Sequence, residues 1–252
     1  MATVANHAPG TPSWVDLGTP DIAGALAFYS GLFGWEGEDQ GEEAGHYTMC
    51  RLRGKAVAAL GPQQNPGPPV WMTYITVASA EQAAVLIPAH GGTVLVPPFD
   101  VFDAGRMAVA VDNAGTAFSI WEPGRHIGAE IVNEPGTLCW NELTTRDKES
   151  AKAFYPAVFG WEAQDHGEYL EWSLDGRVIA GCMPMVGATW PEEIPNHWMT
   201  YFAVEDCDAS AARVAELGGN VAVPPTDIPQ GRLAVCNDPT GGTFSIIAMA
   251  PR

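Results

Sequence analysis

A nine-residue phrase occurs twice in this chain, and that repeat constrains the fold more than any other feature of the sequence. "AFYSGLFGW" spans residues 27–35, and "AFYPAVFGW" spans residues 153–161. Further matches follow in the same order and at nearly the same spacing: "WMTY" (from Trp71 and Trp198), "GG" (from Gly91 and Gly218), "VPP" (from Val96 and Val223), "GR" (from Gly105 and Gly231) and "FSI" (from Phe118 and Phe244). Repeated matches in one register indicate a tandem duplication of about 115 residues, the size of one domain.

The duplication predicts two modules, over residues 11–124 and 137–250 of the 252-residue chain. The segment between them, residues 125–136, lies within the Gly- and Pro-containing stretch "EPGRHIGAEIVNEPG" and is predicted to be a linker. Within each module, β-favouring runs and a helical pattern occur in the order strand, helix and three strands, twice over. A helix between strands, followed by a short antiparallel run, is typical of the α+β class.

The stretch "TPDIAGALAFYSGLFGW" is the clearest helical pattern, because Ile22, Leu26 and Tyr29 fall at helical spacing. Thr19 is the predicted N-cap of this helix. The corresponding helix of the second module carries Pro156, which we expect to kink or shorten it.

The chain is strongly acidic, with 12 Lys and Arg against 30 Asp and Glu, a formal charge of −18. Such a surface repels phosphate and anionic lipid, so neither nucleic acid nor membrane is an expected partner, and a cationic ligand is favoured. The alternative is that the acidity serves solubility alone. The start of the sequence lacks the features of a signal peptide, and no apolar stretch is long enough to span a bilayer. The five cysteines are an odd number without a CxxC motif, which indicates reduced thiols. These features together predict a cytoplasmic protein, and we expect a monomer or a homodimer.

The order of strand, Asp entering a helix, "FY" and "FGW", then "GG" and "FSI" resembles the vicinal oxygen chelate superfamily. That group includes glyoxalase I, extradiol dioxygenases, and bleomycin- and fosfomycin-resistance proteins. The tandem form is similar to an actinobacterial type called glyoxalase-like or hydroxylase, some of which accompany aromatic polyketide antibiotic pathways. The resemblance implies that each module is a pair of βαβββ units whose curved mixed sheet surrounds a cleft.

The resemblance also implies where a metal would be bound, through His, Gln or Glu on the first strand, His or Glu on the fifth and Glu on the eighth. In this chain those positions hold Trp14, Met72 and Ser119 in the first module, and Trp140, Met199 and Ser245 in the second. None of these is a suitable ligand for Zn²⁺, Ni²⁺, Mn²⁺ or Fe²⁺. We therefore expect no metal and no cofactor.

Two polar residues of the second module are candidate catalytic groups. Glu142 shares a strand face with Trp140, and His197 shares one with Met199, because side chains two apart point to the same side. A meeting of Glu142 and His197 would give an acid–base pair or a pair that orients a ligand. Two ligands are fewer than a metal site needs, and either residue could instead contact solvent or a backbone amide.

The remaining candidates form a bed of aromatic and thioether side chains suited to a flat organic ligand. The predicted ligand-binding residues are Trp14, Asp16, Met72, Tyr74, Ser119, Trp121, Trp140, Met199, Tyr201 and Ser245. The competing interpretation is that these strand residues simply pack the core between the sheet and its helices.

Two functional hypotheses follow. The first is a metal-free protein that binds an aromatic or polyketide-like small molecule in antibiotic biosynthesis, sequestration or resistance. The alternative is an enzyme, a glyoxalase-like lyase or isomerase or a hydroxylase, that uses Glu142 and His197. A third interpretation is that only one cleft works, and the extra polar residues then favour the second.

Overall fold

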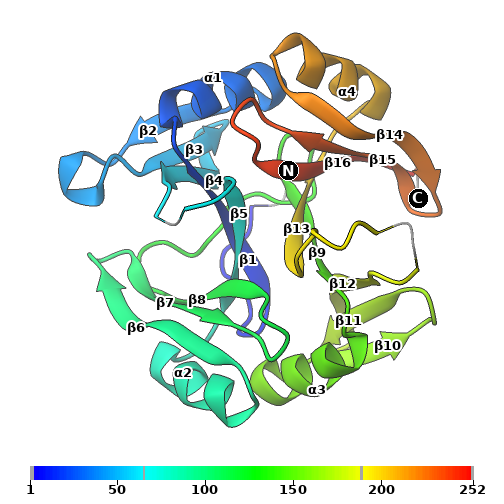
Figure 1. The fold of residues 1–252 in the computed structure, drawn as a ribbon. Coiled ribbons are helices and arrows are strands. Elements are labelled where there is room, and N and C mark those ends of the chain that lie inside the picture. Colours follow the sequence, from blue (N-terminus) through cyan, green and yellow to red (C-terminus); the bar gives the residue numbers. More distant parts are fainter. Residues whose placement is uncertain (1–2, 65, 188–189, 251–252) are drawn as a thin grey trace.

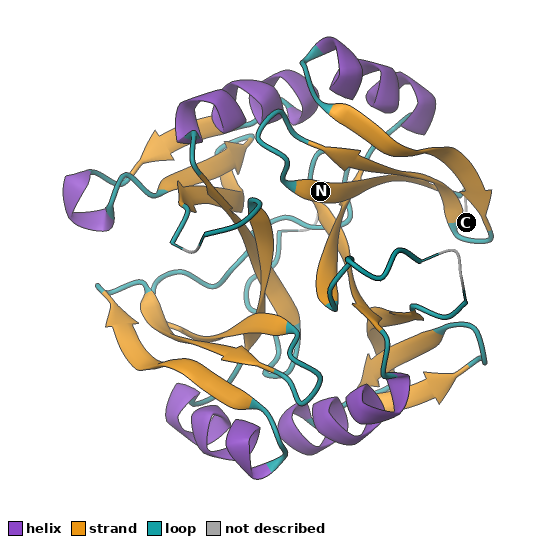
Figure 2. Cartoon of the chain, viewed as in Figure 1, coloured by secondary structure: helices purple, strands orange, loops and turns teal. Residues whose placement is uncertain are grey.

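The computed structural model describes residues 3–64, 66–187 and 190–250 and contains two eight-stranded mixed sheets, one from each module (Figures 1 and 2). The first module comprises β1 (Pro12–Thr19), α1 (Ile22–Phe33), β2 (Glu36–Asp39), the short 3-10 helix η1 (Glu42–Ala44), β3 (Thr48–Leu52), β4 (Lys55–Pro62), β5 (Val70–Thr76), α2 (Ala80–Ala89), β6 (Thr93–Val101), β7 (Gly105–Val111) and β8 (Ala117–Pro123). The second comprises β9 (Leu138–Thr145), α3 (Lys148–Phe159), β10 (Glu162–Asp165), β11 (Leu170–Leu174), β12 (Arg177–Pro184), β13 (His197–Ala203), α4 (Cys207–Glu216), β14 (Asn220–Ile228), β15 (Gly231–Asn237) and β16 (Thr243–Met249). The predicted α+β class with two tandem modules is confirmed.

The strand order is the same in both sheets, β2-β3-β4-β1-β5-β8-β7-β6 and β10-β11-β12-β9-β13-β16-β15-β14. Within each sheet two βαβββ units meet at a central antiparallel pair, β1 with β5 and β9 with β13. Each unit's first strand runs parallel to its last, so β1 pairs with β4 and β5 with β8. The central strands thus bring the two halves of a module side by side, and alternate side chains of both strands lie on the same face of the sheet.

Helix α1 begins two residues later than the sequence predicts. Asp21 caps α1 by accepting a hydrogen bond from the Gly24 N–H, and the Thr19 hydroxyl instead accepts from the Asp21 N–H. The prediction that Thr19 is the cap is therefore wrong. The expected shortening at Pro156 is also wrong, since α3 has the same 12 residues as α1. Pro156 lies in the last turn, where its missing N–H costs only one helical hydrogen bond.

The hydrophobic cores are shared between modules. Phe33 of α1 packs against Phe202 of β13, with ring centroids 5.1 Å apart. Tyr29 of α1 donates a hydrogen bond to Asp238 of the second module (3.0 Å), and Tyr155 of α3 makes the reciprocal bond to Asp112 (3.0 Å). Helix α1 lies beside α4, and α2 beside α3 (Figure 1). The two modules therefore pack into one body.

The segment that connects the modules, residues 125–136, packs against the first module. Ala129 is fully buried, and its N–H donates to the Ser13 carbonyl (2.8 Å). The Glu130 N–H donates to the Ala56 carbonyl (2.8 Å). Gly128 has φ +99°, and a Cβ there would lie 2.6 Å from the Ser13 oxygen, so only glycine fits this close approach. This segment fills the space beside the starts of β1 and β4.

Among the described helices, none is long and apolar enough to cross a membrane. All five cysteines are free thiols.

Candidate functional site

Each sheet carries the same arrangement of four side chains on one face. We name them the first cluster (Trp14, Asp16, Tyr47 and Tyr74) and the second cluster (Trp140, Glu142, Tyr169 and Tyr201). In the second cluster the Tyr169 hydroxyl donates to Glu142 Oε2 and the Tyr201 hydroxyl donates to Glu142 Oε1, both at 2.8 Å. The Trp140 indole N–H donates to the Tyr169 oxygen (3.1 Å). A buried carboxylate is thus held between two phenols, one of which is held in turn by an indole.

The first cluster has the same connectivity around a shorter carboxylate. The hydroxyls of Tyr47 and Tyr74 both donate to Asp16 Oδ2, at 2.9 and 2.7 Å. The Trp14 indole N–H donates to the Tyr47 oxygen (3.2 Å). Since both modules build the unit with different acids, its geometry comes from the sheet and not from the identity of the acid.

Strand register explains why the second cluster forms. Trp140 and Glu142 are two residues apart on β9 and share a face. Across the β9–β13 pair, Tyr201 lies opposite Trp140, and Met199 lies opposite Glu142. On the other side of β9, Gly181 of β12 is the neighbour of Glu142.

Gly181 leaves the space that the phenol of Tyr169 needs. A Cβ at Gly181 would lie 1.8 Å from the Tyr169 hydroxyl oxygen and 2.9 Å from the Trp140 indole nitrogen. Tyr169 immediately precedes β11, so its ring crosses over β12 to reach Glu142. The Tyr169 ring occupies the space that a side chain at Gly181 would fill, whereas the first module forms its cluster with Ala59 at the matching position.

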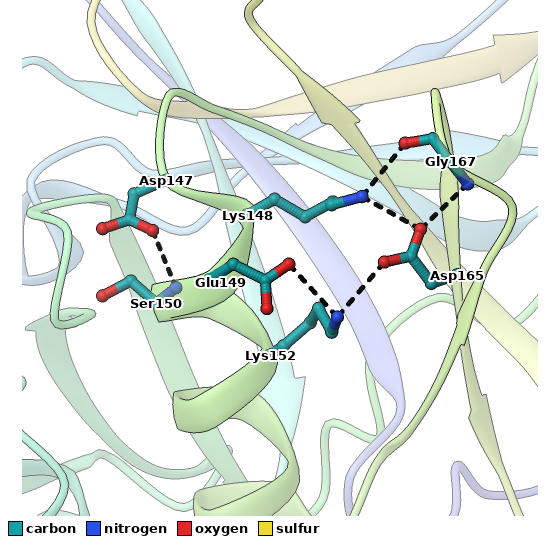
Figure 3. Close-up of polar contacts among 7 residues, drawn as sticks. All are labelled: Asp147, Lys148, Glu149, Ser150, Lys152, Asp165 and Gly167. Atoms are coloured by element: carbon teal, nitrogen blue, oxygen red, sulfur yellow. Dashed lines mark hydrogen bonds and ion pairs between the residues drawn. The ribbon is translucent and has the colours of Figure 1, made fainter.

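The turn before Tyr169 is anchored to α3 (Figure 3). Lys148 Nζ contacts Asp165 Oδ1 (2.9 Å) and the Gly167 carbonyl (3.0 Å), and Lys152 adds a contact to Asp165 (3.2 Å). These bonds hold the pKa of Asp165 well below its usual range. The β10–β11 turn is thereby tied to a helix whose own N-terminus is capped by Asp147, and this restrains the position of Tyr169.

Burial shifts the protonation of both clusters. Burial raises the pKa of Glu142, although the hydrogen bonds from Tyr201 and Tyr169 oppose the shift. Burial likewise raises the pKa of Asp16 to about 6, against the hydrogen bonds from its tyrosines. Burial and the neighbouring acid raise the pKa of Tyr201, so this phenol remains a hydrogen-bond donor at neutral pH. Burial therefore favours the protonated form of both carboxyl groups, and the phenols around them stay protonated.

His197 does not meet Glu142 in the way that the sequence suggests. It lies opposite Thr144 in the β9–β13 register, whereas Met199 lies opposite Glu142. The His197 Nδ1 is 2.9 Å from the Pro195 carbonyl, and burial lowers the pKa of this imidazole. Both oxygens of Glu142 accept from tyrosines instead.

The residues at the family's metal positions do not fit a metal. Trp14 lies opposite Tyr74, which neighbours Ser119 on β8, while Met72 lies opposite Asp16. The second module repeats the row with Trp140, Tyr201 and Ser245. In residues 3–64, 66–187 and 190–250, no three or more His, Cys, Asp and Glu side chains are grouped so that they could hold a metal ion. Indole, phenol and alcohol groups are poor ligands for the metals that this fold family implies.

The two clusters differ in how they are covered. The imidazole of His126, from the connecting segment, packs edge-on against Trp14 with centroids 4.5 Å apart, and Trp14 is only 3% exposed. The Trp121 indole N–H donates to the His126 carbonyl (2.8 Å), which fixes the segment over the cluster. In contrast Trp140 is half-buried, and no aromatic ring of the described residues stacks on it. The tryptophan of the second cluster is therefore the more accessible of the two.

Two surface depressions lie elsewhere, at the junctions of α1 with α4 and of α2 with α3. The first is lined by residues that include Leu32, Val204 and Arg213, and the second by residues that include Val77 and Val158. Neither contains a predicted site residue.

Sequence reasoning missed Tyr47, Tyr169 and Gly181. The tyrosines could have been found, because each stands just before the matching hairpin strand of its module, in "HYTMC" and "EYLEW". Gly181 could not, since its role depends on where the Tyr169 ring crosses the sheet.

A family model, curated relatives and solved structures all match this chain. The Glyoxalase/Bleomycin resistance protein/Dioxygenase superfamily matches residues 11–143 and 126–246. The chain is 43% identical over 267 residues to "Putative glyoxylase CFP32" of Mycobacterium tuberculosis, with 100% of both chains covered. It is 39% identical over 266 residues to "Anthracycline biosynthesis protein DnrV" of Streptomyces peucetius, covering 96% of this chain and 94% of the relative. The Mn(II)-bound glyoxalase from Novosphingobium aromaticivorans has the same fold, with a TM-score of 0.67, 14% identity and coverage of 95% and 82%.

Proposed function

The chain belongs to the Glyoxalase/Bleomycin resistance protein/Dioxygenase superfamily, and from that premise we propose that its second module binds a flat aromatic or polyketide-like small molecule without a metal. The observation that carries the proposal is the half-buried Trp140, whose indole is fixed by its hydrogen bond to Tyr169 beside a buried carboxylate. The name of the relative DnrV, an anthracycline biosynthesis protein, supports a polycyclic aromatic ligand.

The second cluster offers such a ligand both an aromatic surface and an acceptor. The Trp140 ring cannot turn freely while its N–H is bonded, so little entropy is lost when a flat molecule packs on it. Met199, the cross-strand neighbour of Glu142, adds an adaptable apolar contact. Each oxygen of Glu142 accepts one phenol and has lone-pair capacity left for a hydroxyl or ammonium donor of the ligand.

Fluorescence titration tests the proposal. Anthraquinones, anthracyclines and simple phenols would be added to the wild type and to Trp140→Ala. We expect polycyclic compounds to quench tryptophan emission, and Trp140→Ala to weaken their binding by about tenfold, from lost stacking and burial. Trp14→Ala is the matched control, because Trp14 lies under the connecting segment and should affect stability more than binding. Absence of binding below about millimolar concentration would refute the proposal.

A second candidate function is an enzyme, a glyoxalase-like lyase or isomerase or a hydroxylase, in which Glu142 moves a proton. The favouring observation is the pKa of Glu142, which burial raises towards the range useful for general acid–base catalysis. Tyr201 and Tyr169 would then orient its two oxygens. If turnover of a bound ligand is found, Glu142→Gln should lower kcat while leaving affinity nearly unchanged. Equal loss of kcat and affinity would instead favour a binding role alone.

A further inference from the structure

The connecting segment shows what the first module holds in place of a ligand. His126 presents a planar ring to Trp14, and four residues later Glu130 presents a carboxylate to the start of β4. Glu130 Oε2 accepts from the Ala56 N–H (2.7 Å), and Glu130 Oε1 accepts from Lys55 Nζ (3.2 Å). One segment therefore places the His126 ring against Trp14 and, four residues later, the Glu130 carboxylate against Lys55 and the Ala56 N–H.

In the part of the chain that the structure describes, the second module has the corresponding elements without a covering segment. Strand β4 begins with Lys55 and Ala56 after a turn of two left-handed residues, and β12 begins with Arg177 and Val178 after a turn of the same kind. Ala56 is 3% exposed under the connecting segment, whereas Val178 is 46% exposed. Arg177 therefore supplies the positive charge that Lys55 supplies in the first module, and the neighbouring Val178 is exposed.

Arg177 is unusual in its own right. In the described part of the chain, every other lysine and arginine makes an ion pair or a hydrogen bond, as Arg146 does with the Pro191 carbonyl. Arg177 makes none there, although the protein carries a formal charge of −18 and has many acids. A guanidinium that is left unpaired on so acidic a surface is available to a carboxylate from outside the chain.

From this correspondence we infer that the ligand of the second module is an aromatic carboxylic acid, whose ring packs on Trp140 and whose carboxylate binds Arg177 and the Val178 N–H. The inference rests on the proposed function and names the chemical class of its ligand. In the first module the ring and the carboxylate are carried four residues apart, so their Cα atoms lie at most about 14 Å from each other. A fused-ring acid has dimensions of that order.

The proposed ligand class runs against the overall charge. Long-range repulsion from the acidic surface disfavours any anion, so a preference for an acid over its neutral analogue has to come from a local contact. Raising the salt concentration screens the repulsion more than it screens a direct hydrogen-bonded pair. The acid's advantage over the neutral analogue should therefore survive at high salt.

The test compares an anthraquinone carboxylic acid with its carboxamide in calorimetric titrations of the full chain. We expect the wild type to bind the acid about tenfold more tightly, which corresponds to one charge-assisted contact. Arg177→Gln should remove this preference, because it weakens binding of the acid about tenfold more than binding of the carboxamide. Arg125→Gln removes one positive charge elsewhere on the surface and should keep the preference, so it controls for net charge.

The outcomes separate the two proposals. If acid and carboxamide bind equally, or if Arg177→Gln keeps the preference, the carboxylate site is refuted while aromatic binding stands. If neither compound binds, and Trp140→Ala changes nothing, the proposed function fails and the carboxylate inference fails with it.

Discussion

The imidazole of His126 lies edge-on against the indole of Trp14, with the planes of the two rings at 82°. The same imidazole is also 5.7 Å from the ring of Trp121, whose N–H bonds to the His126 carbonyl. The tryptophan of the first cluster is thus covered by the chain's own connecting segment. Among the described residues no aromatic ring stacks on Trp140, and Ile247 occupies the position that matches Trp121. The duplicated modules thus differ in that Trp14 is covered and Trp140 is partly exposed.

Removal of the covering ring should destabilise the protein. His126→Ala would leave a cavity between Trp14 and Trp121, and we expect a loss of about 2 kcal/mol in the free energy of unfolding. Urea unfolding measures it, with the exposed His90→Ala as control. Imidazole in the buffer should restore part of the loss by filling the cavity. Equal stability of both variants would show that His126 does not pack as described.

A methyl group at Gly181 should displace Tyr169 from Glu142. The added Cβ would lie 1.8 Å from the phenol oxygen, so the ring must move and the indole of Trp140 loses its acceptor. We expect Gly181→Ala to weaken aromatic binding by about tenfold and to shift Trp140 emission, as Tyr169→Phe should in part. Ala59→Gly, at the matching position of the first module, is the control and should leave binding unchanged. Wild-type affinity in Gly181→Ala would contradict the role assigned to Tyr169.

The raised pKa of Asp16 predicts a pH dependence of stability. Its pKa is about 6 in the folded protein against 3.8 for an ordinary aspartate, so the folded state holds the proton longer than the unfolded chain. The resulting stabilisation is complete below about pH 3.8 and is lost as pH rises through about 6. The free energy of unfolding of the wild type should therefore fall relative to that of Asp16→Asn between these pH values. A constant difference across the range would mean that Asp16 is not perturbed.

The purified protein should contain no stoichiometric transition metal. The rows formed by Trp14, Tyr74 and Ser119, and by their counterparts in the second module, lack suitable ligands. Elemental analysis checks this expectation. About one Zn²⁺, Ni²⁺ or Fe²⁺ per chain, lost on Glu142→Ala, would contradict it and would favour the enzyme.

Sequence reasoning predicted the architecture well because repeats and strand periodicity are local signals. Trp140, Glu142 and Tyr201 could be placed on one face from alternation along two strands. The pairing of Glu142 with His197 could not be judged, since it depends on the register between strands, which puts Met199 opposite Glu142. The contact of His126 with Trp14 could not be predicted either, because the glycines and prolines of the connecting segment indicate only a linker.

Nuclear magnetic resonance of the individual indole N–H groups tests most directly whether a ligand binds on Trp140 and not on Trp14. In a chain labelled with nitrogen-15 at tryptophan, every indole N–H gives its own resonance, and those of Trp14 and Trp140 can be assigned from Trp14→Phe and Trp140→Phe. On titration with an anthraquinone, we expect the Trp140 resonance to shift to saturation at one ligand per chain while the Trp14 resonance stays in place. A shift at Trp14 alone, or none at either indole while the compound binds, would contradict the assignment of the second cluster as the binding site.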